Sequence, residues 1–212
     1  MKMQILIKTI ENLKNSEIKK IINSRAKEFS ELGKSSINEI FKELCFCLLT
    51  ANFSAHGGIK IQKEIGDGFL TLSEIDLAKK LSELGHRFPN ARAKYIFLAR
   101  EKINNLKKIL ESDESELKKR EEIVKNIKGL GMKEASHFLR NIGYKNLAII
   151  DFHIIDLLVK NNLIVKSKSK SLNVKKYLEI ENLLKEIAQK TNLSLGELDL
   201  YLWYQETGKI LK

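Results

Sequence analysis

The sequence predicts an all-α protein. Its 212 residues include one proline and 11 glycines, so residues that break helices are few for a chain of this length. No pair of strands with alternating polar and apolar residues can be recognised. Ser/Thr-x-x-Glu patterns, which are typical of helix starts, occur at Ser36–Glu39, Thr71–Glu74 and Ser194–Glu197. Helical spacing of apolar residues follows the first of these, at Ile37, Ile40, Phe41, Leu44, Cys47 and Leu48, and recurs from Tyr95 to Ile103.

Turns and loops divide this helical pattern along the chain. The Gly, Ser, Pro and Asn residues predict turns at Leu32–Ser35, Gly66–Gly68, Gly85–Asn90 and Gly129–Gly131. A further helix is expected over His153–Lys160. The Lys/Ser-rich tract Val165–Leu172 is expected to be a solvated loop or linker.

The composition indicates a globular protein with a polyanionic partner. Hydrophobic residues make up 43% of the chain, and 38 Lys and Arg outnumber 27 Asp and Glu, giving a formal net charge of +11. Such a surplus favours nucleic acid through counterion release, although a merely lysine-rich protein would show it too. No apolar run reaches the length of a membrane span, and Lys2, Lys8 and Glu11 interrupt the first helix, so neither a membrane segment nor a signal peptide is expected.

Cysteine and histidine usage argues against a metal centre or a cofactor. Cys45 and Cys47 lie two residues apart in a predicted helix, so they point in different directions and are expected to be buried thiols in a reducing cytoplasm. Two cysteines cannot supply the four ligands of an iron–sulfur cluster. The four histidines do not have the spacing of a zinc site. We therefore expect no cofactor.

Chemistry is concentrated around the sequence Gly129-Leu-Gly131-Met-Lys133. Two glycines between two predicted helices indicate a tight hairpin, because glycine adopts positive φ and permits a close backbone approach. The exposed N–H groups at the start of the second helix can bind a phosphate oxygen. Asp151 follows eighteen residues after Lys133 and can cap the helix that begins near His153. An ordinary turn, followed by an ordinary capping Asp, is the alternative interpretation.

This combination resembles the helix–hairpin–helix DNA glycosylases. The resemblance implies two helical lobes, with an inner bundle over residues 36–127. Residues 1–35 with 128–212 would form the second lobe, which carries the hairpin at about 123–143. It also implies that Lys133 attacks the sugar as a free amine and that Asp151 supports the positive charge developing there. His153 would contact the DNA backbone.

Three further segments match the same family. Asn52 falls where the family inserts a side chain into the gap left by a flipped nucleotide. In the loop that follows Gly85, Phe88 would wedge beside the unpaired opposite base and Arg87 would contact that base or the backbone; a surface turn with an anchoring aromatic is the alternative. His137, one helical turn after Lys133, would line the base pocket, or be an ordinary half-buried histidine.

The C-terminal segment indicates the subfamily. Residues 197–212 are similar to the tail of the second, archaeal-type Ogg family of 8-oxoguanine DNA glycosylases, in which a terminal lysine enters the base pocket. Lys212 and Trp203 occupy the matching positions, although Trp203 also suits a helix core. The resemblance implies a monomeric glycosylase and AP lyase that removes 8-oxoguanine from double-stranded DNA, cytoplasmic and associated with the nucleoid. The alternatives are a same-fold glycosylase for an oxidised pyrimidine or alkylated purine, and a non-catalytic DNA-binding protein.

Overall fold

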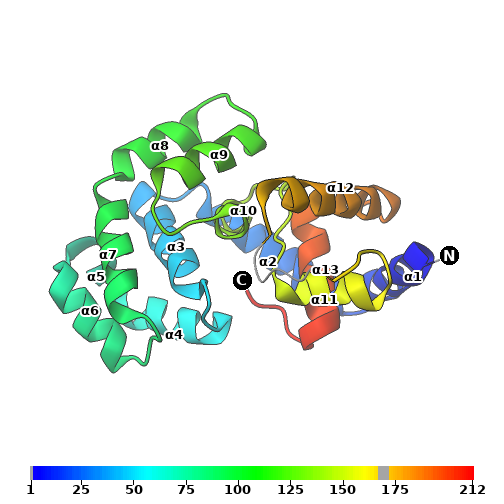
Figure 1. Ribbon diagram of the computed structural model, residues 1–212, viewed down its shortest axis with the longest axis horizontal. Coiled ribbons are helices and arrows are strands. Elements are labelled where there is room, and N and C mark those ends of the chain that lie inside the picture. Colours follow the sequence, from blue (N-terminus) through cyan, green and yellow to red (C-terminus); the bar gives the residue numbers. More distant parts are fainter. Residues whose placement is uncertain (1, 167–171) are drawn as a thin grey trace.

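The chain forms two groups of helices that meet at a central helix, α10 (Figure 1). The computed structural model describes residues 2–166 and 172–212, and these contain thirteen helices and no strand. Residues 167–171 of the Val165–Leu172 tract lie outside the described residues, so the loop predicted there stays a prediction. The all-α prediction is confirmed.

The first group builds one hydrophobic core. Its helices are α3 (Ile37–Thr50), α4 (Ala55–Ile65), α5 (Gly68–Thr71), α6 (Glu74–Glu83), α7 (Pro89–Arg100), α8 (Ile103–Glu111) and α9 (Glu116–Asn126). Helix α3 is central to this core, because every residue from Glu43 to Thr50 is buried. Cys45 and Cys47 are among them as free thiols, as predicted.

The second group combines both ends of the chain. Its helices are α1 (Lys2–Lys14), α2 (Ile18–Leu32), α11 (Phe152–Lys160), α12 (Val174–Lys190) and α13 (Leu195–Thr207). Apolar side chains from all five form a second core. Helix α10 (Met132–Asn141) joins the two groups, since it packs on α3 and α9 on one side and on α2 on the other. Its apolar residues Ala135, Phe138 and Leu139 belong to the first core. The lobe boundary at residue 127 stays a prediction.

Helix caps account for most of the observed boundaries. Ser36 and Ser194 cap α3 and α13 as predicted, with each hydroxyl accepting the N–H of the Glu three residues later. The Thr71 pattern is wrong, because Thr71 ends α5 and Ser73 caps α6, its Oγ accepting the Asp76 N–H at 3.1 Å.

The turn predicted at Gly85–Asn90 is also shorter than expected. Helix α7 begins at Pro89, since proline has no N–H to leave unpaired and its fixed φ suits the first helical position.

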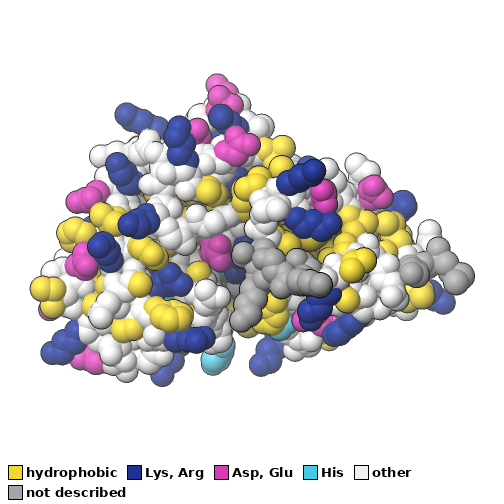
Figure 2. All heavy atoms as spheres, in the orientation of Figure 1, with side chains coloured by type: hydrophobic (Ala, Val, Ile, Leu, Met, Phe, Trp, Pro, Cys, Tyr) yellow, Lys and Arg dark blue, Asp and Glu magenta, His cyan; other side chains and the backbone are white. Residues whose placement is uncertain are grey.

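Charge is distributed widely over the molecule. On the face shown in Figure 2, Lys and Arg side chains lie over both groups of helices. None of the helices in the described part of the chain combines the length and hydrophobicity that a bilayer crossing requires.

Candidate active site and nucleic-acid interface

The hairpin between α9 and α10 needs a glycine at its first position. Gly129 has φ +97°, a conformation that residues with a side chain rarely adopt. A Cβ at this position would come within 2.5 Å of the Tyr95 ring. Both the backbone angle and the close packing therefore require Gly129, as the sequence predicted.

Gly131 differs from Gly129. Its φ of −97° and ψ of −171° are extended, so no strain would arise from another residue. A Cβ there would meet only the Glu134 carboxylate, at 3.3 Å, and the same carboxylate accepts the Gly131 N–H at 3.3 Å. Gly131 therefore leaves open space in front of the first turn of α10, where a ligand can approach the backbone.

Lys133 and Asp151 lie at the starts of two different helices. Lys133 is the second residue of α10, with 23% of its side chain exposed and its Nζ 3.9 Å from Glu134. Asp151 is the N-cap of α11, where its Oδ1 accepts the Ile154 N–H at 3.0 Å. The predicted cap is confirmed, and the helix begins one residue earlier than expected.

The two residues share a buried neighbour, Asp199 on α13. Burial is the main reason that the pKa of Asp199 is raised to about 6. The Asp151 carboxylate also raises this pKa, whereas the positive charges of Arg140 and Lys133 act to lower it. Arg140 lies 3.5 Å from the Asp199 carboxylate. The charges of Lys133 and Asp151 thus both act on Asp199, although eighteen residues separate the two in the chain.

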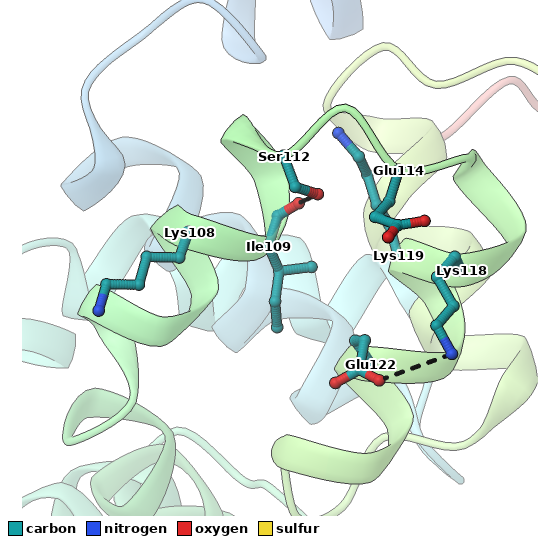
Figure 3. Close-up of a pocket in the computed structure, with 7 residues that line it drawn as sticks. All are labelled: Lys108, Ile109, Ser112, Glu114, Lys118, Lys119 and Glu122. Atoms are coloured by element: carbon teal, nitrogen blue, oxygen red, sulfur yellow. Dashed lines mark hydrogen bonds and ion pairs between the residues drawn. The ribbon is translucent and has the colours of Figure 1, made fainter.

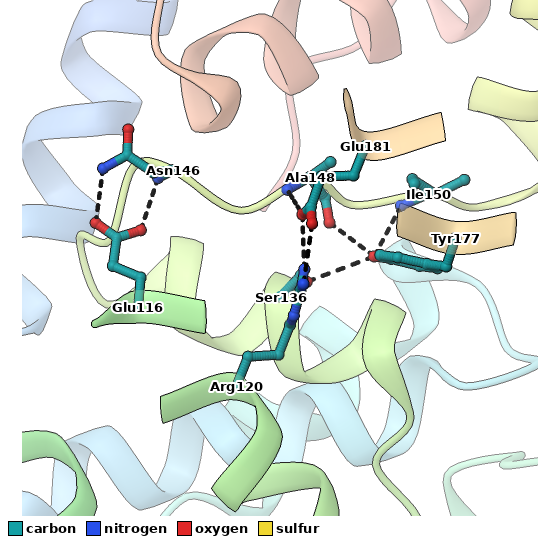
Figure 4. Close-up of polar contacts among 8 residues, drawn as sticks. All are labelled: Glu116, Arg120, Ser136, Asn146, Ala148, Ile150, Tyr177 and Glu181. Atoms are coloured by element: carbon teal, nitrogen blue, oxygen red, sulfur yellow. Dashed lines mark hydrogen bonds and ion pairs between the residues drawn. The ribbon is translucent and has the colours of Figure 1, made fainter. Parts of the chain in front are cut away.

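A buried ion pair ties α10 to the segment that leads into Asp151 (Figure 4). Arg120 on α9 donates to both carboxylate oxygens of Glu181 on α12, at 2.6 and 2.9 Å, and to Ser136 on α10 at 3.1 Å. Glu181 also accepts the Ala148 N–H at 2.9 Å. Both charged side chains are 1% exposed.

Tyr177 on α12 completes this connection. Its hydroxyl donates to the Ala148 carbonyl at 2.7 Å and accepts the Ile150 N–H at 3.4 Å, one residue before Asp151. The same hydroxyl lies 3.4 Å from Ser136. The position of Asp151 relative to the start of α10 is therefore set by fully buried polar contacts.

The C-terminus folds between the two groups of helices (Figure 1). The Lys212 ammonium donates to Glu43 at 2.7 Å and to Gln62, and it lies 4.5 Å from the centre of the Phe46 ring. Glu43 is 2% exposed and also accepts from Asn141 of α10 at 2.6 Å. The terminal lysine is thus anchored to α3 and α4.

His137 lies beside this tail. Its ring is 5.7 Å from Phe46 in an edge-on arrangement. Burial, with the charges of Arg140 and Lys133, lowers the pKa of His137 well below its ordinary value, while the nearby Lys212 backbone raises it. Neither ring nitrogen makes a hydrogen bond with any residue that the structure describes. A neutral, buried imidazole without a partner is available to a ligand.

Trp203 and His153 pack against each other on α13 and α11. Their ring centres are 4.6 Å apart and the planes nearly perpendicular. Phe152, with 66% of its surface exposed, lies with its ring centre 3.9 Å from that of His153, tilted by 36°. Trp203 is half-buried, and its Nε1 has no partner among the described residues.

The remaining predicted residues lie on two loops of the first group. Asn52 follows α3, is exposed and has φ +60°. Phe88 is 38% exposed, and the Arg87 guanidinium lies 5.0 Å from the centre of its ring. In the described part of the chain, no cluster of His, Cys, Asp and Glu is placed to hold a metal ion.

Comparison with known proteins identifies the family. The model of the Ogg helix–hairpin–helix family, described as 8-oxoguanine DNA glycosylase, matches residues 22–193. The chain belongs to this family. A relative in Methanocaldococcus jannaschii, named 8-oxoguanine DNA glycosylase/AP lyase, is 60% identical over 208 residues, covering 98% of this chain and all of the relative.

Two solved structures of the same family support the fold. The M. jannaschii enzyme in complex with a 15mer DNA containing 8-oxoguanine has a TM-score of 0.94 at 59% identity, covering 98% of this chain and all of that one. The Thermotoga maritima 8-oxoguanine DNA glycosylase has a TM-score of 0.92 at 44% identity, covering 99% and 100%.

Several residues at the site of this Ogg-family chain escaped sequence reasoning. Glu43 and Gln62 hold the tail, and Asp199 and Arg140 lie beside the catalytic candidates. Only Glu43 gave a signal, as an acidic residue within the apolar face of α3. Gln62, Arg140 and Asp199 contact residues that are far away in the sequence, so no local pattern marks them.

A hollow on the surface lies apart from these residues (Figure 3). It measures about 220 Å³ between α8 and α9. It is lined by Lys108, Ile109, Ser112, Glu114, Lys118, Lys119 and Glu122. Lys118 and Glu122 pair at 3.9 Å. None of its lining residues belongs to the hairpin, the two loops or the tail.

Proposed function

We propose that this chain is a bifunctional DNA glycosylase and AP lyase that excises 8-oxoguanine from double-stranded DNA in base excision repair. The observation that carries the proposal is the placement of Lys133 in the first turn of α10 and of Asp151 at the start of α11, two elements joined by Tyr177, whose hydroxyl contacts both Ser136 of α10 and the Ile150 N–H. The names of the relatives over the full chain length support the same activity.

The proposed chemistry uses the Lys133 amine and the Asp151 carboxylate. The free Lys133 amine attacks C1′ of the sugar, the bond from C1′ to the base breaks, and the base leaves with its electron pair and takes up a proton. The negative charge of Asp151 stabilises the oxocarbenium-like sugar. Opening of the sugar ring gives a Schiff base to Lys133. Loss of a C2′ proton then expels the 3′ phosphate, and water releases the enzyme.

The base pocket is proposed to comprise His137, Trp203 and Lys212. 8-Oxoguanine differs from guanine by a hydrogen on N7 and an oxygen at C8, so the pocket needs an acceptor for N7–H or a donor for the oxygen. The Lys212 ammonium, which lies beside His137 and the Phe46 ring, would supply a donor for that oxygen. The burial of His137 and the anchoring of Lys212 by Glu43 support this assignment.

DNA contacts are proposed for Asn52, Arg87, Phe88, Gly129, Gly131 and His153. A base inside a duplex is out of reach, so the nucleotide must be flipped out and the gap filled. Exposed loops with an amide, a guanidinium and an aromatic ring suit this step. We further propose a monomer acting on chromosomal DNA in the cytoplasm.

Borohydride trapping tests the catalytic assignment. Lys133→Gln should abolish both base release and the covalent adduct on 8-oxoguanine duplexes, while lesion binding persists. Lys128→Gln, which changes an exposed lysine of the same hairpin, is the matched control and should still be trapped at saturating DNA. An adduct with Lys133→Gln would assign the chemistry to another amine. Faster release of an oxidised pyrimidine or alkylated purine than of 8-oxoguanine would show that the other lesion is the preferred substrate.

Removal of Lys212 tests the tail. Excision of 8-oxoguanine should fall far more than cleavage at a preformed abasic site, because only the first reaction needs base recognition. A C-terminal extension should have the same effect. Unchanged lesion excision by either variant would show that the tail lies outside the base pocket.

A further inference from the structure

His86 connects the two loops that carry the proposed DNA-inserting residues. It precedes α7 and is 4% exposed, although it is a polar residue in a surface loop. Its Nε2 lies 3.0 Å from the Leu49 carbonyl at the end of α3, and its Nδ1 lies 3.0 Å from the Phe88 backbone N–H. One imidazole thus bonds to its own loop and to the last turn of α3, which leads directly into the Asn52 loop.

These two contacts specify one form of the ring. The Phe88 backbone N–H can only donate, so Nδ1 carries a lone pair and Nε2 carries the hydrogen that is donated to Leu49. Leu49 lies in the last turn of α3, where carbonyls have no partner within the helix. Burial lowers the pKa of His86, which favours this neutral form.

Further contacts hold Asn52 from both sides. The Phe53 ring stacks on His86 with centres 4.4 Å apart. Arg92 of α7 donates to the Ala51 carbonyl and lies 6.0 Å from the Phe88 ring. Asn52 itself has φ +60°, so its backbone direction depends on these flanking residues. These contacts join the residues on either side of Asn52 to the loop and helix that carry Phe88 and Arg92.

We infer that His86 is a positioning residue, which holds the Asn52 loop and the Arg87–Phe88 loop in the one arrangement that enters the duplex. The inference rests on the proposed role of these loops in filling the gap left by the flipped nucleotide. Two loops that are already held in place reduce the entropic cost of binding DNA, because their conformational entropy has been lost when the protein folds. The flipped nucleotide reaches Lys133 only after the loops have entered the duplex.

Variants of His86 separate the two contacts. His86→Asn retains an acceptor near the Nδ1 position, His86→Gln retains a donor near the Nε2 position, and His86→Leu retains neither. For His86→Leu we expect a fall of about tenfold in single-turnover excision from the duplex, and less than about threefold from a single-stranded lesion. His86→Asn and His86→Gln should fall between wild type and His86→Leu.

Fluorescence of 2-aminopurine beside the lesion supplies a readout that general loosening would not move. The rise that reports unstacking should be slower with His86→Leu. Tyr144→Phe is the matched control, since it removes a hydroxyl that bonds the Leu110 carbonyl of α8 at 3.3 Å and makes no bond to either loop. It should keep the wild-type ratio of duplex to single-strand rates.

The outcomes distinguish the inference from the proposed function. If Phe88→Ala shows the duplex-selective loss and His86→Leu does not, the positioning role of His86 is wrong. If Phe88→Ala shows no such loss, the role proposed for the loop itself fails. Should His86→Leu fold poorly, His86→Asn and His86→Gln decide the matter. In the double variant His86→Leu with Phe88→Ala, a loss of activation free energy equal to the sum of the two single losses would also overturn the inference, because the effects of contacting residues that act together are not additive.

Discussion

Glu181→Gln would leave the Arg120 guanidinium buried without a counter-charge. The replacement keeps the size and shape of the side chain, so packing in the second core is unchanged. In the wild-type protein, Glu181 accepts two hydrogen bonds from Arg120 and one from the Ala148 N–H. A Gln amide offers one oxygen, and its NH₂ group must face one of these donors.

The expected loss of stability is large because both side chains are 1% exposed. Breaking a buried pair by removing one partner costs about 3–5 kcal/mol. For a chain of this size each kcal/mol lowers Tm by about 2–4 °C, so a fall of about 6–20 °C is expected. The bond to Ala148 is part of this cost, since a buried N–H without an acceptor costs about 1–3 kcal/mol.

Urea unfolding followed by circular dichroism measures the loss, with an unchanged m-value as the sign that only stability has moved. Glu179→Gln on the same helix is the control, because Glu179 pairs with Lys176 where both side chains are about half exposed, 46% and 48%. Its midpoint should not move measurably. Equal midpoints for Glu181→Gln and Glu179→Gln would refute the reasoning. In Arg120→Met with Glu181→Leu no unpaired charge remains, so the loss should be smaller than in Glu181→Gln.

Three further predictions concern the site. Asp151→Asn keeps an oxygen for the helix cap and removes the charge, so single-turnover base release should slow by at least about a hundredfold with little change in Tm; a large fall in Tm with normal activity per folded molecule would leave only a capping role. Gly129→Ala should cost about 1–3 kcal/mol in urea unfolding through its positive φ and the Tyr95 contact, whereas Gly131→Ala should unfold like wild type yet bind DNA more weakly. Equal DNA affinity for Gly131→Ala and wild type would exclude a phosphate at that backbone. Burial raises the pKa of Asp199 from 3.8 to about 6, so the folded state holds a proton there that the unfolded state has released, and this group's contribution to stability falls as pH rises from about 4 to 6. Asp199→Asn should therefore gain in Tm relative to wild type across that window, and a constant difference would contradict the assignment.

Features that depend on residues close together in the chain could be predicted from the sequence. Ser36 and Ser194 cap helices because the hydroxyl and the N–H that it accepts are three residues apart. The positive φ of Gly129 and the cap at Asp151 are equally local. Local rules failed at Thr71, where Ser73 offered an equivalent cap two residues later. Thr71 is the last residue of α5, and its hydroxyl donates to the Asp67 carbonyl at 3.2 Å instead of capping α6.

Only the tertiary structure decided which distant groups meet. The pairing of Arg120 with Glu181 spans 61 residues, and that of Lys212 with Glu43 spans 169. His86 meets Leu49 across 37. Charge and polarity marked these side chains as groups that need a partner when buried, but they did not say which one. That choice follows from helix packing, which brings α9 beside α12 and the chain end beside α3, and no periodicity in a single segment contains this information.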